Sequence, residues 1–185
     1  MKQRNLTYVN SSRFMNYGVY GASLTVPPTL YTGPPTSSGL WRDRSIGHQS
    51  NIYERMLHED DVSVYVIWLG YNDARWSSNI NLANFSNKYE KMIADIQNAA
   101  AMATPLYRIL CLTPFNNPNN LREFRDGLEV PRQVSSVAHK GLCELVDVYN
   151  NVTFSQNLLD GDNVHLNKDG ETEVANLVIN HLYAV

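Results

Sequence analysis

The chain has 185 residues, of which 43% are hydrophobic and 18% are charged, and we find no internal boundary that would divide it. One globular domain with a buried core is therefore expected, and disordered, collagenous and disulfide-stapled proteins are excluded. The formal net charge of −3 and the pI near 5.9, without a run of Lys or Arg, argue against a nucleic-acid partner.

Membrane and compartment signals are weak. No apolar run approaches the roughly 20 residues that span a bilayer, so we expect a soluble chain without a membrane span. The two cysteines, Cys111 and Cys143, allow at most one disulfide, and Cys111 lies in an apolar run where a thiol packs as a small hydrophobe. The compartment stays open: an extracellular protein and a part of a phage or other surface-associated protein both fit.

The first third of the chain predicts few regular elements. Residues 1–15 are polar and without a period, and we interpret them as a lead-in or linker before a single domain at 16–185. A first strand is predicted at 16–21, with a tight turn after it. A loop rich in Pro, Gly, Thr and Ser follows, then a weak second strand at 39–46 and a helix at 50–58.

The middle of the chain carries the strongest patterns. Residues 62–69 are apolar apart from Ser63, which predicts a strand covered on both faces at the centre of a parallel sheet. Residues 82–103 have apolar side chains at helical intervals and predict a long amphipathic helix. A second buried strand is expected at 106–113, and the irregular segment 114–126 indicates a loop.

The last third alternates helix and strand again. Pro131 suits the first turn of a helix, a last strand is predicted at 145–149, and Asn167 is a candidate cap of a terminal helix with Asp169 and Glu171 in its first turn. Strands alternating with helices predict an α/β fold, a flavodoxin-like three-layer α/β/α sandwich with a parallel sheet of about five strands. Ligands of such sheets bind beyond the carboxyl ends of the strands.

Polar residues follow three of the predicted strands. Ser23 comes after the first strand, residues 70–73 with Asn72 come after the central one, and residues 162–165 come before the terminal helix. Acyl transfer needs a hydroxyl nucleophile, a base, an acid that orients the base, and donors for the developing oxyanion. Asp162 and His165 lie three residues apart in a loop, so the carboxylate can fix the imidazole tautomer.

These segments resemble the sequence blocks of the GDSL/SGNH hydrolase superfamily of esterases, lipases and carbohydrate deacetylases. The resemblance covers about residues 16–185 and rests on Gly-Ala-Ser-Leu-Thr at 21–25, a glycine at 47, Gly-Tyr-Asn-Asp at 70–73 and Asp-Asn-Val-His at 162–165. It implies that Ser23 is the nucleophile, His165 the base and Asp162 its orienting partner. It also implies an oxyanion hole formed by the backbone N–H groups of Ser23 and Gly47 and the side-chain amide of Asn72.

Two departures from the family pattern are visible. Ala22 stands where the family usually has Asp beside the nucleophile, and we expect this loss to loosen the turn before it abolishes chemistry. Gly47 has no distinctive context, and Gly39 competes with it as the oxyanion glycine. Each block alone would more often be a turn or a cap, so the interpretation depends on their conjunction and order.

Other residues near the blocks have open roles. Tyr71 and Trp76 could stack on a sugar, or they could pack in the core. No trio of His, Cys or carboxylates has metal-ligand spacing, so we expect no metal and no cofactor. Cys111 and Cys143 are better explained by packing than as nucleophiles.

We therefore expect a serine ester hydrolase that removes small acyl groups, such as acetyl, from a carbohydrate or another polar carrier. The short chain leaves little room for a lipase lid, and the loops at 27–39 and 116–126 are polar. One alternative is a glycan-binding or structural module that keeps the fold with little turnover; another is a lipase or thioesterase of the same superfamily. The polar start is compatible with a module of a larger polypeptide.

Overall fold

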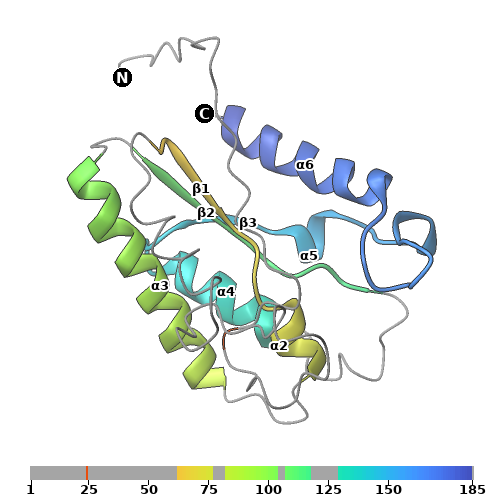
Figure 1. Ribbon diagram of the computed structural model, residues 1–185, viewed down its shortest axis with the longest axis horizontal. Coiled ribbons are helices and arrows are strands. Elements are labelled where there is room, and N and C mark those ends of the chain that lie inside the picture. Colours follow the sequence, from red (N-terminus) through yellow and green to blue (C-terminus); the bar gives the residue numbers. More distant parts are fainter. Residues whose placement is uncertain (1–23, 25–61, 77–81, 104–106, 118–128, 185) are drawn as a thin grey trace, which may run out of the picture.

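The computed structural model describes residue 24 and residues 62–76, 82–103, 107–117 and 129–184 (Figure 1). Three parallel strands form its sheet in the order β1-β2-β3, namely β1 Val64–Ile67, β2 Arg108–Leu112 and β3 Glu144–Val146. The α/β fold with a parallel sheet is confirmed, with fewer strands in the described residues than the five expected. The predicted lead-in, the strands at 16–21 and 39–46 and the helix at 50–58 lie outside the described residues.

Helices lie on both faces of this sheet. Figure 1 shows α6 on one side and α3 and α4 on the other, which gives three layers. The helices are α2 Tyr71–Trp76, α3 Leu82–Ala103, α4 Glu129–His139, α5 Val148–Asn151 and α6 Lys168–Tyr183, with a 3-10 turn η5 at Gln156–Leu158.

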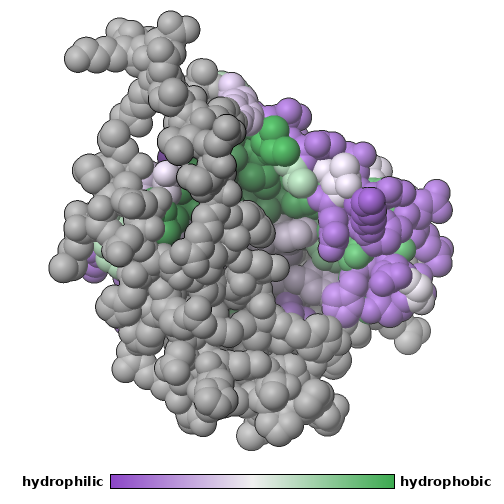
Figure 2. Space-filling view, turned by 45° about the horizontal axis from the view of Figure 1, so that its top comes forward, coloured by the Kyte–Doolittle hydropathy of each residue, from purple (hydrophilic) through white to green (hydrophobic). Residues whose placement is uncertain are grey.

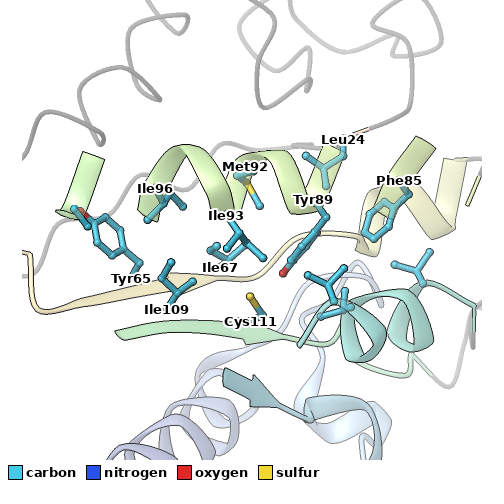
Figure 3. Packing of buried hydrophobic residues seen from close by; sticks show 14 of the residues in the cluster. Leu24, Tyr65, Ile67, Phe85, Tyr89, Met92, Ile93, Ile96, Ile109 and Cys111 are labelled. Carbon is cyan, nitrogen blue, oxygen red and sulfur yellow. The ribbon is translucent and has the colours of Figure 1, made fainter. Parts of the chain in front are cut away.

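The first core lies between the sheet and the helices α3 and α4 (Figure 3). Helix α3 buries one apolar stripe because its large side chains recur every three or four residues. Its members are Phe85, Tyr89, Met92, Ile93, Ile96 and Ala100. The predicted long helix at 82–103 is confirmed at both ends, and Pro131 lies in the first turn of α4 as expected.

Strand β2 is buried on both faces. Ile109 and Cys111 pack in the first core, whereas Leu110 and Leu112 pack in a second core under α6 that also holds Val174. Successive side chains of a strand point to opposite faces, so its unbroken apolar run follows from this double cover. Among the described strands, β2 therefore occupies the middle position that the sequence suggested for residues 62–69.

Strand β1 is fully buried on one face and only partly covered on the other, where Val64 packs against the second core. Tyr65 and Ile67 are 6% exposed and face α3, but Val66 is 50% exposed, so the expectation of a doubly covered strand is wrong here. The reason is that α6 packs on the neighbouring strands β2 and β3. Trp68 is also partly exposed. Figure 2 shows one face of the molecule, on which a hydrophobic area lies beside a hydrophilic one.

The last strand is shorter than predicted. It ends at Val146, and Asp147 then caps helix α5 by accepting a hydrogen bond from the backbone N of Asn150 at 3.2 Å. A capping carboxylate outweighs the apolar alternation that continues to Tyr149, so the predicted strand at 145–149 is wrong beyond Val146. The predicted cap of the terminal helix is confirmed: the Asn167 side chain caps α6 by accepting from the backbone N of Asp169 and Gly170.

Candidate active site

Helix α2 begins at the carboxyl end of β1 and carries Asn72. The chain turns into it at Gly70, whose φ of 111° favours glycine. A Cβ at this position would lie 2.6 Å from Cγ1 of Val130 and 3.2 Å from Phe85, so the turn packs directly on α4 and α3. The sequence did not predict this helix, because six residues are too few to show a period.

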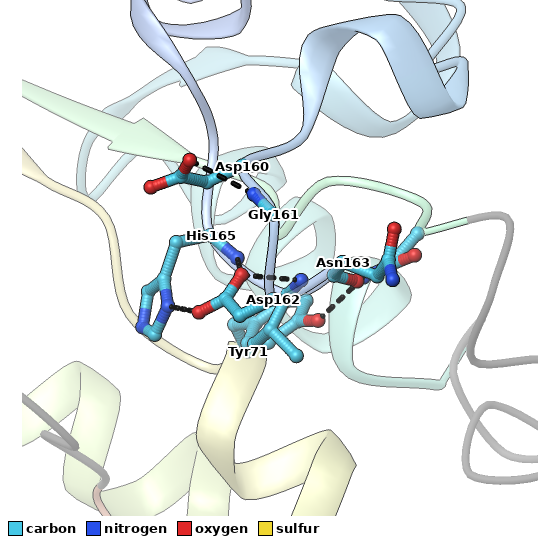
Figure 4. Close-up of polar contacts among 8 residues, drawn as sticks. Tyr71, Asp160, Gly161, Asp162, Asn163 and His165 are labelled. Atoms are coloured by element: carbon cyan, nitrogen blue, oxygen red, sulfur yellow. Dashed lines mark hydrogen bonds and ion pairs between the residues drawn. The ribbon is translucent and has the colours of Figure 1, made fainter.

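Asp162 and His165 form a hydrogen-bonded pair in the loop before α6 (Figure 4). His165 Nδ1 donates to Asp162 Oδ2, while Asp162 Oδ1 accepts from the backbone N of Val164 and of His165, each at 2.9 Å. The backbone N–H of His165, its ring and the N–H of Val164 hold the pKa of the Asp162 carboxyl well below its ordinary value. The carboxylate is therefore anionic at neutral pH.

This pairing fixes the tautomer of the neutral imidazole. An anionic carboxylate can only accept, so the proton resides on Nδ1 and Nε2 becomes the accepting nitrogen. The His165 and Asp162 side chains are 51% and 49% exposed, so solvent and a dissolved substrate can reach them. The pair therefore has the form of a general base with its orienting acid.

Backbone contacts hold the loop in this shape. Residues Leu159 and Leu166 form an antiparallel bridge, and the backbone N of Asp160 donates to the O of His165 at 2.7 Å. Asn163 adopts the left-handed conformation with a φ of 57°, which Asn tolerates better than most residues. The pair is thus carried by a loop that closes on itself rather than by one side-chain contact.

A buried hydrogen bond links α2 to the residue that follows the predicted nucleophile. Ser23 lies outside the described residues, but Leu24 is described and is only 3% exposed. Its backbone N donates to both carboxylate oxygens of Asp73, at 2.9 and 3.0 Å, and its O accepts from Lys88 Nζ at 2.8 Å. Because Ser23 is bonded to Leu24 and Asn72 to Asp73, the predicted nucleophile and oxyanion donor are each one residue from this contact.

A second link joins α2 to the Asp162–His165 loop. The Nδ2 of Asn117, which follows β2, donates to Tyr71 Oη at 3.0 Å and to the backbone O of Asn163 at 2.9 Å. The structure thus brings the block around Asn72 and the block around His165 to one place at the carboxyl end of the sheet.

The remaining predicted residues are placed less completely. The ring of Tyr71 stacks on Phe115 with centroids 4.6 Å apart, which engages one of its faces. Trp76 ends α2, and its side chain is outside the described residues, as are Gly47 and Gly39. The substrate-binding role of Tyr71 and Trp76 and the oxyanion role of Gly47 stay predictions.

Three residues that the sequence did not single out support the site, namely Asp73, Lys88 and Asn117. Asp73 lies inside the Gly-Tyr-Asn-Asp block, and a carboxylate buried to 0% exposure is a signal only once burial is known. In the part of the chain that the structure describes, no three His, Cys, Asp or Glu residues are grouped to hold a metal ion. None of its described helices has the length and apolar character of a membrane span.

The two cysteines are free thiols. Cys111 is buried in the first core, and a hydrogen bond with Cys143, together with burial, raises the pKa of the Cys111 thiol. Such a thiol resists forming the thiolate that attacks a carbonyl, in agreement with a packing role.

Comparison with known proteins identifies similar molecules. A family model described as GDSL-like Lipase/Acylhydrolase matches residues 2–178. The solved lipase/acylhydrolase from Enterococcus faecalis is similar at 18% identity over 81% of this chain and 70% of its own, with a TM-score of 0.55, which supports the fold. A proposed platelet activating factor from Streptococcus pneumonia matches at 18% identity over 71% of this chain and 66% of its own, with a TM-score of 0.49. No curated protein matches the chain.

Proposed function

Because the chain belongs to the GDSL-like lipase/acylhydrolase family, whose members hydrolyse esters, we propose that it is a serine ester hydrolase with Ser23 as nucleophile, His165 as base and Asp162 as orienting acid. The observation that carries the proposal is the Asp162–His165 pair, in which the anionic carboxylate holds the ring with Nε2 as acceptor. A base in this tautomer is what a serine hydroxyl requires.

The reaction proceeds in two steps. His165 Nε2 takes the proton of the Ser23 hydroxyl as Oγ attacks the acyl carbonyl, and the imidazolium then protonates the leaving alcohol. Water, deprotonated by the same nitrogen, attacks the acyl-enzyme and releases the acid. The side-chain amide of Asn72 and the backbone N–H groups of Ser23 and Gly47 donate to the oxyanion in both steps. Asp162 stays ionised and stabilises the imidazolium.

The substrate class that we propose is a small acyl group, such as acetyl, on a carbohydrate or another polar carrier. The half-exposed Asp162 and His165 support an open site that a polar molecule enters from water. The loop that carries them contributes further exposed polar residues, Asp160 and Asn163. A long acyl chain would instead need a sizeable apolar surface beside the base.

Turnover is favoured over a merely glycan-binding role by the Asp73–Leu24 contact. Ala22 removes the carboxylate that the family usually has next to the nucleophile, and this absence motivates the binding-module alternative. The buried carboxylate of Asp73, however, anchors the residue on the other side of Ser23. Leu24 is therefore held to α2 even though residue 22 is not an acid.

Hydrolysis of p-nitrophenyl esters tests the proposal. The parent chain should release p-nitrophenol from the acetate faster than from the octanoate, and Ser23→Ala should abolish both. A fluorophosphonate probe should label the parent at Ser23 quickly and leave His165→Ala almost unlabelled. Equal hydrolysis by parent and Ser23→Ala would refute the site, whereas a parent that is folded and unlabelled would favour the binding module. A preference for octanoate would favour the lipase alternative, and an acetate-release screen over acetylated glycans would then identify the carrier.

A further inference from the structure

Asn117 bonds both helix α2 and the loop of Asp162 and His165, which are far apart in sequence. It follows β2, whereas Tyr71 begins α2 and Asn163 lies between Asp162 and His165. Each of the two contacts spans 46 residues of sequence, at 3.0 Å to Tyr71 Oη and 2.9 Å to the O of Asn163. A planar amide donates its two hydrogens in fixed directions, so these two bonds together define where the loop lies relative to the helix.

The surroundings of Asn117 make these bonds selective. Its side chain is 1% exposed, so water does not replace a lost partner. On the Tyr71 side the ring is also fixed, because it stacks on Phe115, which in turn packs against Phe154. On the Asn163 side the acceptor is a backbone oxygen in a residue with a φ of 57°, and its side-chain oxygen accepts from Gln156 at 3.1 Å. Each acceptor is therefore fixed within its own segment, and the two bonds from Asn117 fix the two segments relative to each other.

Helix α2, which Asn117 contacts through Tyr71, carries Asn72 and binds Leu24. Tyr71 precedes Asn72, the proposed oxyanion donor, and Asp73 holds Leu24 beside Ser23. The loop that it contacts carries the proposed acid and base. The separation between α2 and this loop is thus the separation between the helix that carries Asn72 and binds Leu24 on one side and the proposed base on the other.

We infer that Asn117 is a positioning residue that sets the distance between His165 and the Ser23–Asn72 side of the site. The inference rests on the proposed function. Asn117 does not touch the substrate; it acts through Tyr71 and the backbone of Asn163. Its loss leaves Asp162 and His165 bonded to each other but displaces both together, so it impairs proton transfer more than substrate binding.

Asn117→Ala tests this inference, with Thr113→Ala as the matched control. Thr113 is also a fully buried polar residue at the end of β2, but its hydroxyl contacts Asp147 and the backbone N of Tyr149 at α5. We expect Asn117→Ala to lower kcat on p-nitrophenyl acetate by about 10- to 100-fold with KM within about twofold, since a displacement near 1 Å costs up to about 10²-fold. Thr113→Ala should lower the urea midpoint similarly and keep kcat within about twofold of the parent. Equal kcat losses in both variants would overturn the inference.

A second measurement separates positioning from general destabilisation. In the His165→Ala background no imidazole is left to position, so adding Asn117→Ala should leave the residual rate unchanged within about twofold. A further fall by the same factor as in the parent would show that Asn117 acts elsewhere and would overturn the inference.

Failure of the proposed function gives a different result. In that case Ser23→Ala hydrolyses the probe like the parent, whatever Asn117→Ala does. If Asn117→Ala does not fold, Tyr71→Phe replaces it, because this variant keeps the stacked ring and removes one of the two acceptors. Tyr71→Phe should lower kcat severalfold in the parent and not in the His165→Ala background; an unchanged parent kcat would overturn the inference.

Discussion

Removing the carboxylate of Asp73 should loosen the chain on the far side of the predicted nucleophile. In Asp73→Ala the buried backbone N–H of Leu24 loses the two oxygens that accept from it at 2.9 and 3.0 Å. A hydrogen bond to a charged acceptor contributes about 1.5 to 3 kcal/mol, and a buried N–H left without an acceptor costs about 1 to 3 kcal/mol. We therefore expect Asp73→Ala to reduce the free energy of unfolding by about 2 to 3 kcal/mol.

Asp73→Asn is the matched variant, because it keeps the volume and one acceptor oxygen. Neutral hydrogen bonds are about half as strong as charge-assisted ones, so its loss should be about half of that of Asp73→Ala. With a urea m-value of about 2 kcal/mol per M, the midpoint should fall by about 1 to 1.5 M for Asp73→Ala and about half as much for Asp73→Asn.

Catalysis should follow the same order as stability. Because Leu24 adjoins Ser23, the rate of fluorophosphonate labelling should fall by about 10- to 100-fold in Asp73→Ala and less in Asp73→Asn. Stability is measured by urea unfolding monitored by tryptophan fluorescence. The labelling rate is measured at pH 7 without denaturant. An Asp73→Ala variant that keeps both the parent midpoint and the parent labelling rate would refute the reasoning from the Leu24 contact.

Three further predictions follow from the site and its loop. Asn72→Ala should lower kcat about 10²- to 10³-fold while circular dichroism stays that of the parent, because one oxyanion donor is lost and the fold is not; an unchanged kcat would remove Asn72 from the oxyanion hole. The carboxyl of Asp162 has a folded-state pKa below its unfolded value of about 3.9. Its pairing therefore stabilises the fold above a pH of about 3.9, and this contribution is lost as the pH falls towards the folded-state pKa. Carbon NMR should find Asp162 still ionised at pH 3, and a carboxyl that titrates near 4 would contradict the pairing. Gly170→Ala should lower the melting temperature and kcat together, because its Cβ would lie 2.3 Å from the backbone O of Leu158, whereas Gly161→Ala, with nothing within 4 Å of its Cβ, should behave like the parent; thermal melts of both variants decide this.

Periodicity predicted the larger elements because the spacing of apolar side chains and the capping residues that determine them lie within each segment. The stripe of α3 and the cap Asn167 of α6 are local signals, and both are confirmed. The end of β3 was missed because the apolar alternation continues to Tyr149 and hides the cap, in which Asp147 accepts from the backbone N of Asn150. The Thr113 hydroxyl, 34 residues away in sequence, also donates to Asp147, and no local pattern encodes that contact. The partly exposed face of β1 was missed because an apolar run does not reveal which elements cover a strand. Val66 is exposed although it is as apolar as the buried residues of β2.

The candidate site was predictable only as far as its residues resemble family blocks. The order of Ser23, Asn72, Asp162 and His165 predicted a common site. The bonds that Asn117 donates to α2 and to the loop of His165 support one place for the last three of them. Asp73 and Asn117 could not be found in this way. Their roles depend on burial and on partners 46 to 49 residues away, which no local pattern encodes.

The acid and the base share one short loop that also closes on itself through the Leu159–Leu166 bridge. A shift of this loop relative to α2 therefore moves the acid and the base together and keeps the hydrogen bond between them. The loop from 156 to 167 is therefore one structural unit that holds the acid and the base together.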